Sequence, residues 1–402
     1  MHYRLRGGQM AAYPRLILKR GKERPLLRGH PWIFSGAVAK IAGEVSPGEV
    51  GEVYSKEGQF LGLGHINPHS QIILRLLTQQ KEELGGNFFG ERISRAAVLR
   101  RNWLNRKTNA YRVINGEGDY LPGLIVDRYG DVLVVQLLTA GVERLKELLT
   151  NLLAKEFRPQ SIFERSDAAT RNEEGLPESR GLLYGKEVPE FIEIEEYGCR
   201  FKANVKKGQK TGFYLDQREN RFSLRRFSKE KKILDCFCYT GAFSIHGGSG
   251  GAREITLIDS SEEALAVAEE HFALNQLGGI PHEFVRGDVF EVLRGLESTY
   301  DIVILDPPPF AKKKGHLPGA SRGYKDLNLW AFRLLNQDGL LLTFSCSHHM
   351  NWDLFQKIVF SAALDSGRRV QLIGRMGHPY DHPINLCHPE GEYLKGLICR
   401  VL

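Results

Sequence analysis

The chain has 402 residues, of which 42% are hydrophobic and 26% charged, so we expect two or three packed domains and exclude a disordered or fibrous protein. No run approaches the roughly 18 consecutive apolar residues of a membrane span, and the first ten residues lack the apolar core of a signal peptide, so we expect a soluble, cytoplasmic protein. The net charge is +7, but residues 1–110 hold 18 Lys and Arg against 8 Asp and Glu, a basic excess that favours a polyanionic partner over a merely solvated charged surface.

The six cysteines form no CxxC pair and no spaced Cys/His set of the zinc-binding kind. We therefore predict neither a disulfide framework nor a metal site. His348 and His349 are adjacent, so on a strand their side chains would point to opposite faces and could not share one metal.

The N-terminal part reads as a small β-barrel followed by a basic helix. Short β-type runs at 15–18, 49–54 and 71–77 alternate with Gly and Pro, which is typical of strands joined by tight turns. We assign the barrel to residues 13–85, and residues 1–12 to an extension that we expect to be disordered. A basic helical linker follows over residues 86–110.

Two further domains are predicted. Residues 111–200 combine strand runs at 123–126 and 131–135 with a helix around 142–155, as in a small α+β domain. From 201 to 402, near-continuous apolar strands alternate with helices, so we expect a predominantly parallel, doubly wound α/β sheet of the Rossmann-like kind. Its strands are predicted at residues 232–235, 254–259, 283–288, 301–306 and 339–344.

Aspartates end three successive strands of this predicted sheet. In doubly wound sheets, ligands bind beyond the carboxyl ends of the strands, where Asp259 could accept ribose hydroxyls and Asp288 an adenine amine. After Asp235 the first turn carries Phe237 and Tyr239 where a pyrophosphate-binding turn would have glycines. The pattern therefore favours S-adenosylmethionine over a dinucleotide; the simpler alternative is that the three acids only cap helices.

The fourth and fifth strands end in a second pair of reactive groups. Asp306 precedes three prolines, a corner suited to gripping a planar base, and Cys346 follows the fifth strand. If the two strands are neighbours, a thiolate could add to C6 of a pyrimidine and activate C5, while the Asp306 carboxylic acid donates a proton to N3 of the ring. The corner alone would suggest methylation of an exocyclic nitrogen.

Nearly the whole chain, from about residue 15 to 402, resembles the RlmI-like family of PUA-domain class I methyltransferases, which form 5-methylcytosine in large-subunit ribosomal RNA. The motifs that carry the resemblance are Leu27–Gly36 (LRGHPWIFSG), Gly123–Asp127, Glu164–Asp167, Lys210–Arg218, Asp306–Phe310, Ser345–Ser347 and Tyr393–Gly396.

The resemblance implies a PUA-like RNA-binding barrel, S-adenosylmethionine as cofactor, ribosomal RNA as partner and, commonly, a homodimer. It implies Cys346 as the nucleophile and Asp306 as the residue that orients the base. The implied cofactor-binding residues are Gln217, Asp235, Phe237, Tyr239, Gly241, Asp259, Ser260, Asp288, Val289 and Asp306. The implied RNA contacts are Arg28, His30, Trp32, Pro307, Phe310, Lys312 and Lys313.

One departure from the family and two other functions are kept open. His246–Gly251 is rich in glycine where relatives are richer in alanine, so the helix after the first turn is expected to end early. An RNA nitrogen methyltransferase would use the Asp306 corner without needing Cys346. A non-catalytic RNA-binding assembly factor would keep the fold and cofactor pocket alone.

Overall fold

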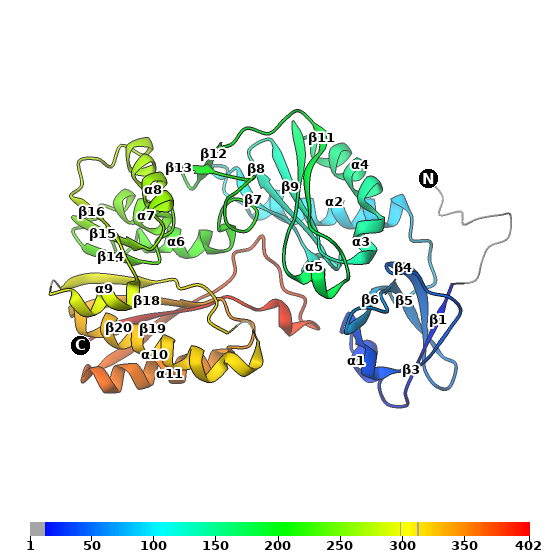
Figure 1. Cartoon of the computed structure of the whole chain (residues 1–402). Coiled ribbons are helices and arrows are strands. Elements are labelled where there is room, and N and C mark those ends of the chain that lie inside the picture. Colours follow the sequence, from blue (N-terminus) through cyan, green and yellow to red (C-terminus); the bar gives the residue numbers. More distant parts are fainter. Residues whose placement is uncertain (1–12, 298, 312) are drawn as a thin grey trace. The chain divides into compact units, whose positions relative to one another are not determined.

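The structure is a computed structural model that describes residues 13–297, 299–311 and 313–402 (Figure 1). The predicted extension over residues 1–12 lies outside the described residues. The chain forms two compact units. The first comprises Met1–Ile192, Ala203–Phe213 and Tyr380–Gly391, and the second comprises Glu193–Lys202, Tyr214–Pro379 and Glu392–Leu402.

The first unit begins with a six-stranded sheet in the order β2-β6-β5-β4-β1-β3. The predicted strands at 15–18 and 49–54 are confirmed, and the run at 71–77 forms a strand displaced by one residue. Close packing explains the glycines of β5, because a Cβ at Gly62 would lie 2.4 Å from the Thr78 carbonyl oxygen. The elements are β1 (Arg15–Leu18), α1 (Arg24–Leu27), β2 (Trp32–Phe34), β3 (Val38–Ala42), β4 (Glu49–Tyr54), β5 (Phe60–Ile66) and β6 (Ile72–Thr78).

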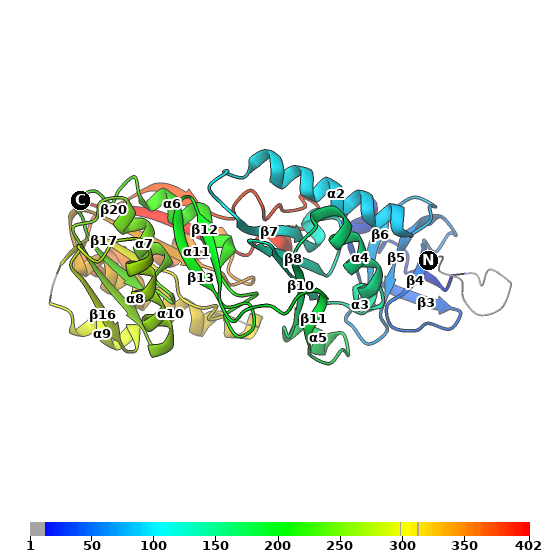
Figure 2. The ribbon, with the colours of Figure 1, turned by 90° about the horizontal axis from the view of Figure 1, so that it is seen from above.

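The first unit continues with a five-stranded sheet in the order β11-β10-β9-β8-β7, with α2 and α4 packed together beside it (Figure 2). The helix predicted around 142–155 is divided at Leu145 into two helices. The elements are α2 (Gly86–Trp103), β7 (Ala110–Asn115), β8 (Leu124–Tyr129), β9 (Val132–Leu137), α3 (Ala140–Arg144), α4 (Lys146–Phe157), β10 (Ser161–Ser166), α5 (Thr170–Glu173) and β11 (Ser179–Gly185).

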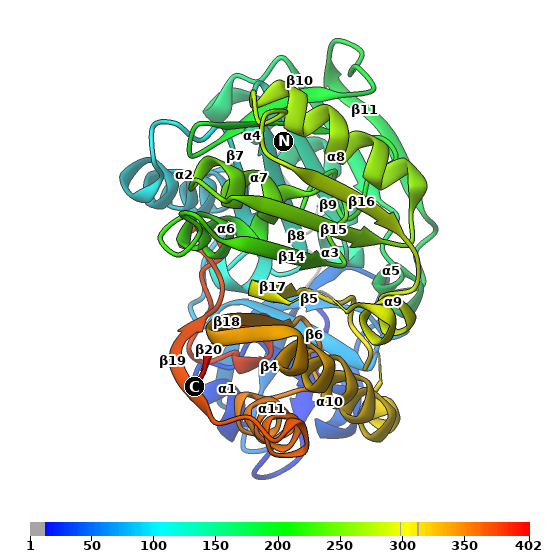
Figure 3. The same ribbon diagram turned by 90° about the vertical axis from the view of Figure 1, so that its left-hand side faces the viewer.

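The second unit contains a seven-stranded sheet in the order β16-β15-β14-β17-β18-β20-β19 (Figure 3). Five strands are parallel, and β20 runs antiparallel to both of its neighbours. All five predicted strands are present, as β14 (Lys232–Cys236), β15 (Glu254–Asp259), β16 (His282–Arg286), β17 (Tyr300–Leu305) and β18 (Leu335–Ser345), followed by β19 (Val370–Met376) and β20 (Lys395–Val401).

Helices form two groups around this sheet: α6 and α8 pack on α7, and α9 and α11 on α10 (Figure 3). The α7 helix ends at Ser249, immediately before Gly250. The remaining elements are the hairpin β12 (Ile192–Glu196) and β13 (Cys199–Ala203), and α6 (Arg218–Leu224), α7 (Ala242–Ser249), α8 (Glu262–Leu274), α9 (Val289–Gly295), α10 (Leu317–Leu334) and α11 (Trp352–Ser366).

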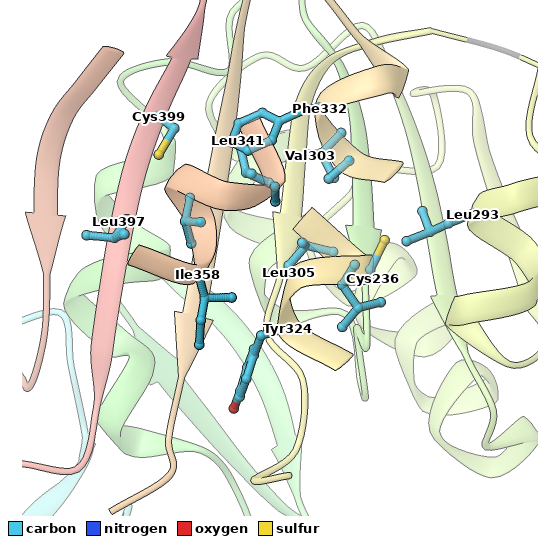
Figure 4. Close-up of a cluster of buried hydrophobic side chains, with 14 of the residues drawn as sticks. Cys236, Leu293, Val303, Leu305, Tyr324, Phe332, Leu341, Ile358, Leu397 and Cys399 are labelled. Carbon is cyan, nitrogen blue, oxygen red and sulfur yellow. The ribbon is translucent and has the colours of Figure 1, made fainter. Parts of the chain in front are cut away.

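The apolar core on the α10 side explains why the strands alternate as they do. Leu305 and Leu341 from neighbouring strands pack with Tyr324 and Phe332 of α10 and with Ile358 of α11 (Figure 4). Because side chains alternate along a strand, the intervening residues face the α7 side. Burial on both faces accounts for the near-continuous apolar runs in the sequence.

A segment between β19 and β20 leaves the second unit and packs in the first. Arg100 of α2 donates to the Asp381 carbonyl oxygen (2.6 Å), and the Arg112 amide donates to the Asp381 carboxylate (2.8 Å). The Asn115 side chain donates to the Pro383 carbonyl oxygen (3.0 Å). Nothing in the sequence pattern predicted this excursion.

In the described part of the chain, no helix is both long and apolar enough to cross a membrane.

Candidate active site

The turn after β14 is built around a buried carboxylate. Asp235 is 1% exposed and accepts hydrogen bonds from the Ser244 amide (3.1 Å) and hydroxyl (2.7 Å) in the first turn of α7. Burial raises the pKa of Asp235 to about 7, and the nearby Asp306 and Asp259 add to the rise. Asp235 Oδ1 and Thr240 Oγ1 are buried without a hydrogen-bond partner among the described residues. Two such atoms in one turn fit a site that receives a polar ligand.

The backbone of this turn adopts glycine-like conformations at residues that are not glycine. Phe237 has φ 61° and Tyr239 has φ 50°, while Gly241, at the start of α7, has φ 71°. Positive φ is costly for bulky side chains, so the surrounding fold must impose it. The turn thus keeps the tight path of a nucleotide-binding loop while two aromatic side chains fill the space that glycines would leave open.

Asp259 and Asp288 both bind backbone amides at the starts of the helices that follow them. Asp259 accepts from the amides of Tyr239 and Ser261 (both 2.9 Å), and Asp288 caps α9 by accepting from Phe290 (2.7 Å). The capping alternative is therefore correct as far as these contacts go. Each carboxylate oxygen has further acceptor capacity, so capping does not remove a ligand-binding role. Of the two neighbours predicted with them, Ser260 is exposed and Val289 is buried in the core.

A buried glutamine orients the carboxylate beyond β17. Gln217, 2% exposed, donates from Nε2 to Asp306 Oδ1 (2.9 Å), and its own oxygen accepts from Asn220 (2.7 Å). This chain of hydrogen bonds runs from α6 to the end of the sheet. It fixes the side-chain amide of Gln217, and through it the rotamer of Asp306.

Cys346 lies just past the end of β18, the strand that pairs with β17. Leu305 lies opposite Thr343, so Asp306 and Cys346 both follow paired strands at the same edge of the sheet. The Cys346 side chain is half-buried, and its Sγ lies 3.7 Å from the Pro307 carbonyl oxygen. The neighbour relation on which the sequence argument depended is therefore confirmed.

Hydrogen bonds to the flanking serines determine which way Cys346 points. The Ser345 hydroxyl donates to the Tyr324 hydroxyl (3.1 Å), which also lies 3.4 Å from the Ser347 hydroxyl. Both serines are buried. Because successive side chains in an extended segment alternate, the thiol between them is directed away from Tyr324 and out of the core.

The predicted RNA contacts of the second unit are only partly exposed. Pro307 is buried, and the Phe310 ring packs against Tyr324 with 4.8 Å between centroids. Lys313 is exposed, whereas Lys312 lies outside the described residues. Phe310 therefore has a packing role whatever else it does.

In the first unit, two of the three predicted RNA contacts hold the 380–391 excursion. The Trp32 ring lies 4.3 Å from the His388 ring, and its indole N–H donates to Glu117 (2.8 Å). His30 Nε2 lies 3.3 Å from a Glu390 carboxylate oxygen. Arg28 is exposed.

Comparison with known proteins decides the family. A profile described as "PUA-like domain" matches residues 16–79, and one described as "S-adenosylmethionine-dependent methyltransferase" matches residues 121–355. The chain is 44% identical to proteins named ribosomal RNA large subunit methyltransferase I from Cronobacter sakazakii, covering 96% of this chain and 99% of the relative, and from Salmonella arizonae, covering 97% and 98%. The chain belongs to this methyltransferase family.

Solved structures agree with this membership. A Streptococcus mutans protein described as an S-adenosylmethionine-dependent methyltransferase superposes with a TM-score of 0.83 at 25% identity, covering 96% of this chain and all of that one. A methyltransferase complexed with SAH superposes with a TM-score of 0.84 at 26% identity, covering the same shares. This methyltransferase therefore has the expected PUA-like domain and Rossmann-like fold, and its cofactor is S-adenosylmethionine.

The sequence had given no role to several residues that build the site of this methyltransferase. Ser244, Asn220 and Tyr324 hold Asp235, Gln217 and the Cys346 segment in place. Lys395 is 1% exposed, and its ammonium donates to the Ser347 carbonyl oxygen (2.9 Å). A lysine that opens an otherwise apolar strand was the one signal that could have found it.

Proposed function

We propose that the chain methylates C5 of a cytosine in 23S ribosomal RNA through a covalent adduct with Cys346. The observation that carries this proposal is the placement of a half-buried thiol, directed out of the core, beside the Asp306 corner on the neighbouring strand end. A nitrogen methyltransferase has no use for such a thiol. The names of the relatives support ribosomal RNA as substrate.

In the proposed reaction, the RNA presents an unstacked cytosine, as enzymes acting on base atoms require. The Cys346 thiolate forms a bond to C6, the electrons of the C5–C6 double bond move into the ring, and Asp306, held by Gln217, donates a proton to N3. S-adenosylmethionine, when bound, supplies the methyl group that C5 receives. Loss of the C5 proton then restores the double bond and breaks the Cys346–C6 bond.

The residues proposed to hold the cofactor are those at the carboxyl ends of β14 to β17. Asp235 with its unpartnered Oδ1, the Phe237–Gly241 turn, Asp259 and Asp288 surround the start of α7 and its neighbours, and Gln217 and Asp306 complete the set. Arg28, His30, Trp32, Pro307, Phe310 and Lys313 remain our candidates for RNA contact. An enzyme acting on ribosomal RNA would work in the cytoplasm.

Replacing Cys346 with Ala tests the mechanism. We expect the Cys346→Ala variant to form no methylated cytosine, a loss of at least about a thousandfold, because the adduct supplies the nucleophilic carbon. SAH affinity, measured by calorimetry, should stay within about twofold. The substrate is ribosomal RNA lacking the modification, and the product is identified by nucleoside mass spectrometry.

A trapping experiment distinguishes the rival functions. RNA carrying 5-fluorocytidine at the target should form a covalent complex with the unsubstituted enzyme, because fluorine cannot leave as a proton does. Cys346→Ala should form none. A methylated guanine or exocyclic amine in the product would favour the nitrogen methyltransferase, and RNA binding without methyl transfer would favour an assembly factor.

A further inference from the structure

Lys395 occupies a position where a lysine is costly. It is the first residue of β20 and lies directly opposite Ser345, the last residue of β18. Its side chain belongs to a residue that is only 1% exposed. Transferring an ammonium group out of water costs several kcal/mol unless other groups compensate it.

The compensation visible around Lys395 points to Cys346. The ammonium donates to the Ser347 carbonyl oxygen (2.9 Å) and forms no ion pair with any described carboxylate. Burial lowers the pKa of Lys395 to about 8, and the two groups that oppose this shift are Cys346 and Glu392. Glu392 accepts a hydrogen bond from the Trp352 indole (2.8 Å). The thiol of Cys346 is thus one of two groups able to offer the buried cation a negative charge.

The other groups that surround Cys346 carry no positive charge. Tyr214, which precedes Gln217, and Tyr324 on α10 both interact electrostatically with Cys346 and with Asp306, and burial raises the pKa of each phenol. Asp306 follows β17, and His348 on the same segment as Cys346 is exposed. Among these groups, Lys395 is the cation that lies buried at the strand end.

We propose that Lys395 is a positioning residue that holds the Ser345–Ser347 segment and stabilises the Cys346 thiolate. The thiol proton passes to solvent, and the thiolate remains paired with the ammonium until its sulfur bonds to the base. When that bond breaks at the end of the reaction, the same ammonium receives the thiolate back. The inference rests on the proposed function for its purpose, but the thiol chemistry can be measured without RNA.

The first measurement uses the unmodified protein and an internal reference. Iodoacetamide alkylation is followed from pH 5 to 10, and mass spectrometry of peptides gives the rate at each cysteine. Cys387 is the exposed reference in the same chain. We expect Cys346 to reach half its maximal rate at least about one pH unit below Cys387, because a nearby cation favours the thiolate. Equal half-maximal pH values would overturn the proposal.

Two substitutions then assign the effect to the charge. Lys395→Met keeps the length and removes the ammonium, so the half-maximal pH of Cys346 should rise by about one to two units, and alkylation at pH 7 should slow at least about tenfold. Lys395→Arg keeps the charge and should restore most of the shift. Tyr324→Phe disturbs the same segment without changing a charge and should leave the half-maximal pH in place.

The outcomes separate this inference from the proposed function. A Lys395→Met protein that binds SAH normally but alkylates like the unmodified protein would contradict the inference, even if the enzyme makes 5-methylcytosine. A protein that makes no 5-methylcytosine would contradict the proposed function while leaving the thiol result intact. If neither Lys395 variant folds, the comparison of Cys346 with Cys387 decides alone.

Discussion

At the scale of single residues, Asp235 shows how burial changes the meaning of a sequence motif. An aspartate after a strand reads as an anion that binds hydroxyls, but its pKa near 7 means that at neutral pH the carboxyl is shared between charged and neutral forms. Ser244 donates two hydrogen bonds to one of its oxygens, and this partly offsets the loss of hydration.

The raised pKa of Asp235 predicts a pH-dependent stability. The folded state holds its proton up to about pH 7, whereas the unfolded state releases it near 3.8, so this group's stabilising contribution is complete below 3.8 and is lost as the pH rises through about 7. Asp235→Asn removes the charged form. We expect the variant to gain roughly 2 kcal/mol relative to the parent between pH 5 and pH 8.

Urea unfolding of the cofactor-free proteins at pH 5, 6, 7 and 8 measures this difference. Ser260→Ala, an exposed change at the same edge of the sheet, serves as the control and should follow the parent at every pH. Parallel curves for Asp235→Asn and the parent would mean that Asp235 is ionised throughout.

At the scale of secondary-structure elements, a buried ion pair joins β12, α6 and α7. Arg221 of α6 donates from two nitrogens to the two oxygens of Glu196 (2.7 and 2.6 Å), and His246 of α7 lies 3.0 Å from Glu196. The side chains of Glu196 and His246 are fully buried. Arg225 donates to His246 Nδ1 (3.0 Å), so Nε2 carries the proton toward Glu196. The network connects the β12–β13 hairpin to the first helix of the sheet.

Removing Arg221 should destabilise the second unit strongly. Arg221→Met leaves the Glu196 carboxylate buried with only a histidine as partner, so we expect a loss of about 3–5 kcal/mol of unfolding free energy. Lys357→Met is the control, since its partner Asp353 lies one turn away on exposed α11 and the change should cost less than about 0.5 kcal/mol. Denaturant titration compares them, and similar midpoints would show that the buried pair adds no stability.

At the scale of the whole molecule, the 380–391 excursion makes the first unit depend on a segment that follows β19. Gly118 lies where this segment packs: a Cβ there would come within 1.9 Å of the Pro383 carbonyl oxygen. Neither group can yield easily, because one is backbone and the other would be fixed to it. The excursion is therefore held by close packing as well as by the hydrogen bonds of Arg100 and Asn115.

Gly118→Ala should displace the excursion. We expect amide hydrogen exchange in peptides covering residues 380–391 to become at least about tenfold faster, because the segment loses its seat and its hydrogen bonds open more often. Gly279→Ala, at a glycine with no atom within 4 Å of the added Cβ, should leave exchange unchanged. Unaltered protection in the Gly118 variant would mean that the excursion is held elsewhere. The homodimer expected from the family remains a prediction, which light scattering of the purified protein would test.

The predictable part of the fold followed from local pattern. Five apolar strands alternating with helices were read correctly because burial on both faces leaves an unmistakable composition. The strands that were missed include β5, whose glycines reflect the closeness of β6, and β20, whose first residue is a buried lysine. Their residue types are explained by contacts with distant segments, so no local pattern could reveal them.

The sequence by itself determined the order of the strands along the chain, the acids after them and the presence of a thiol after β18, since these depend on periodicity and on motifs. Only the tertiary structure decided that β17 and β18 are neighbours, that Gln217 holds Asp306, and that Lys395 lies buried opposite Ser345. These facts depend on which segments meet in space, and pairing across 40 or more residues is selected by packing of the whole sheet, not by any residue's own preference.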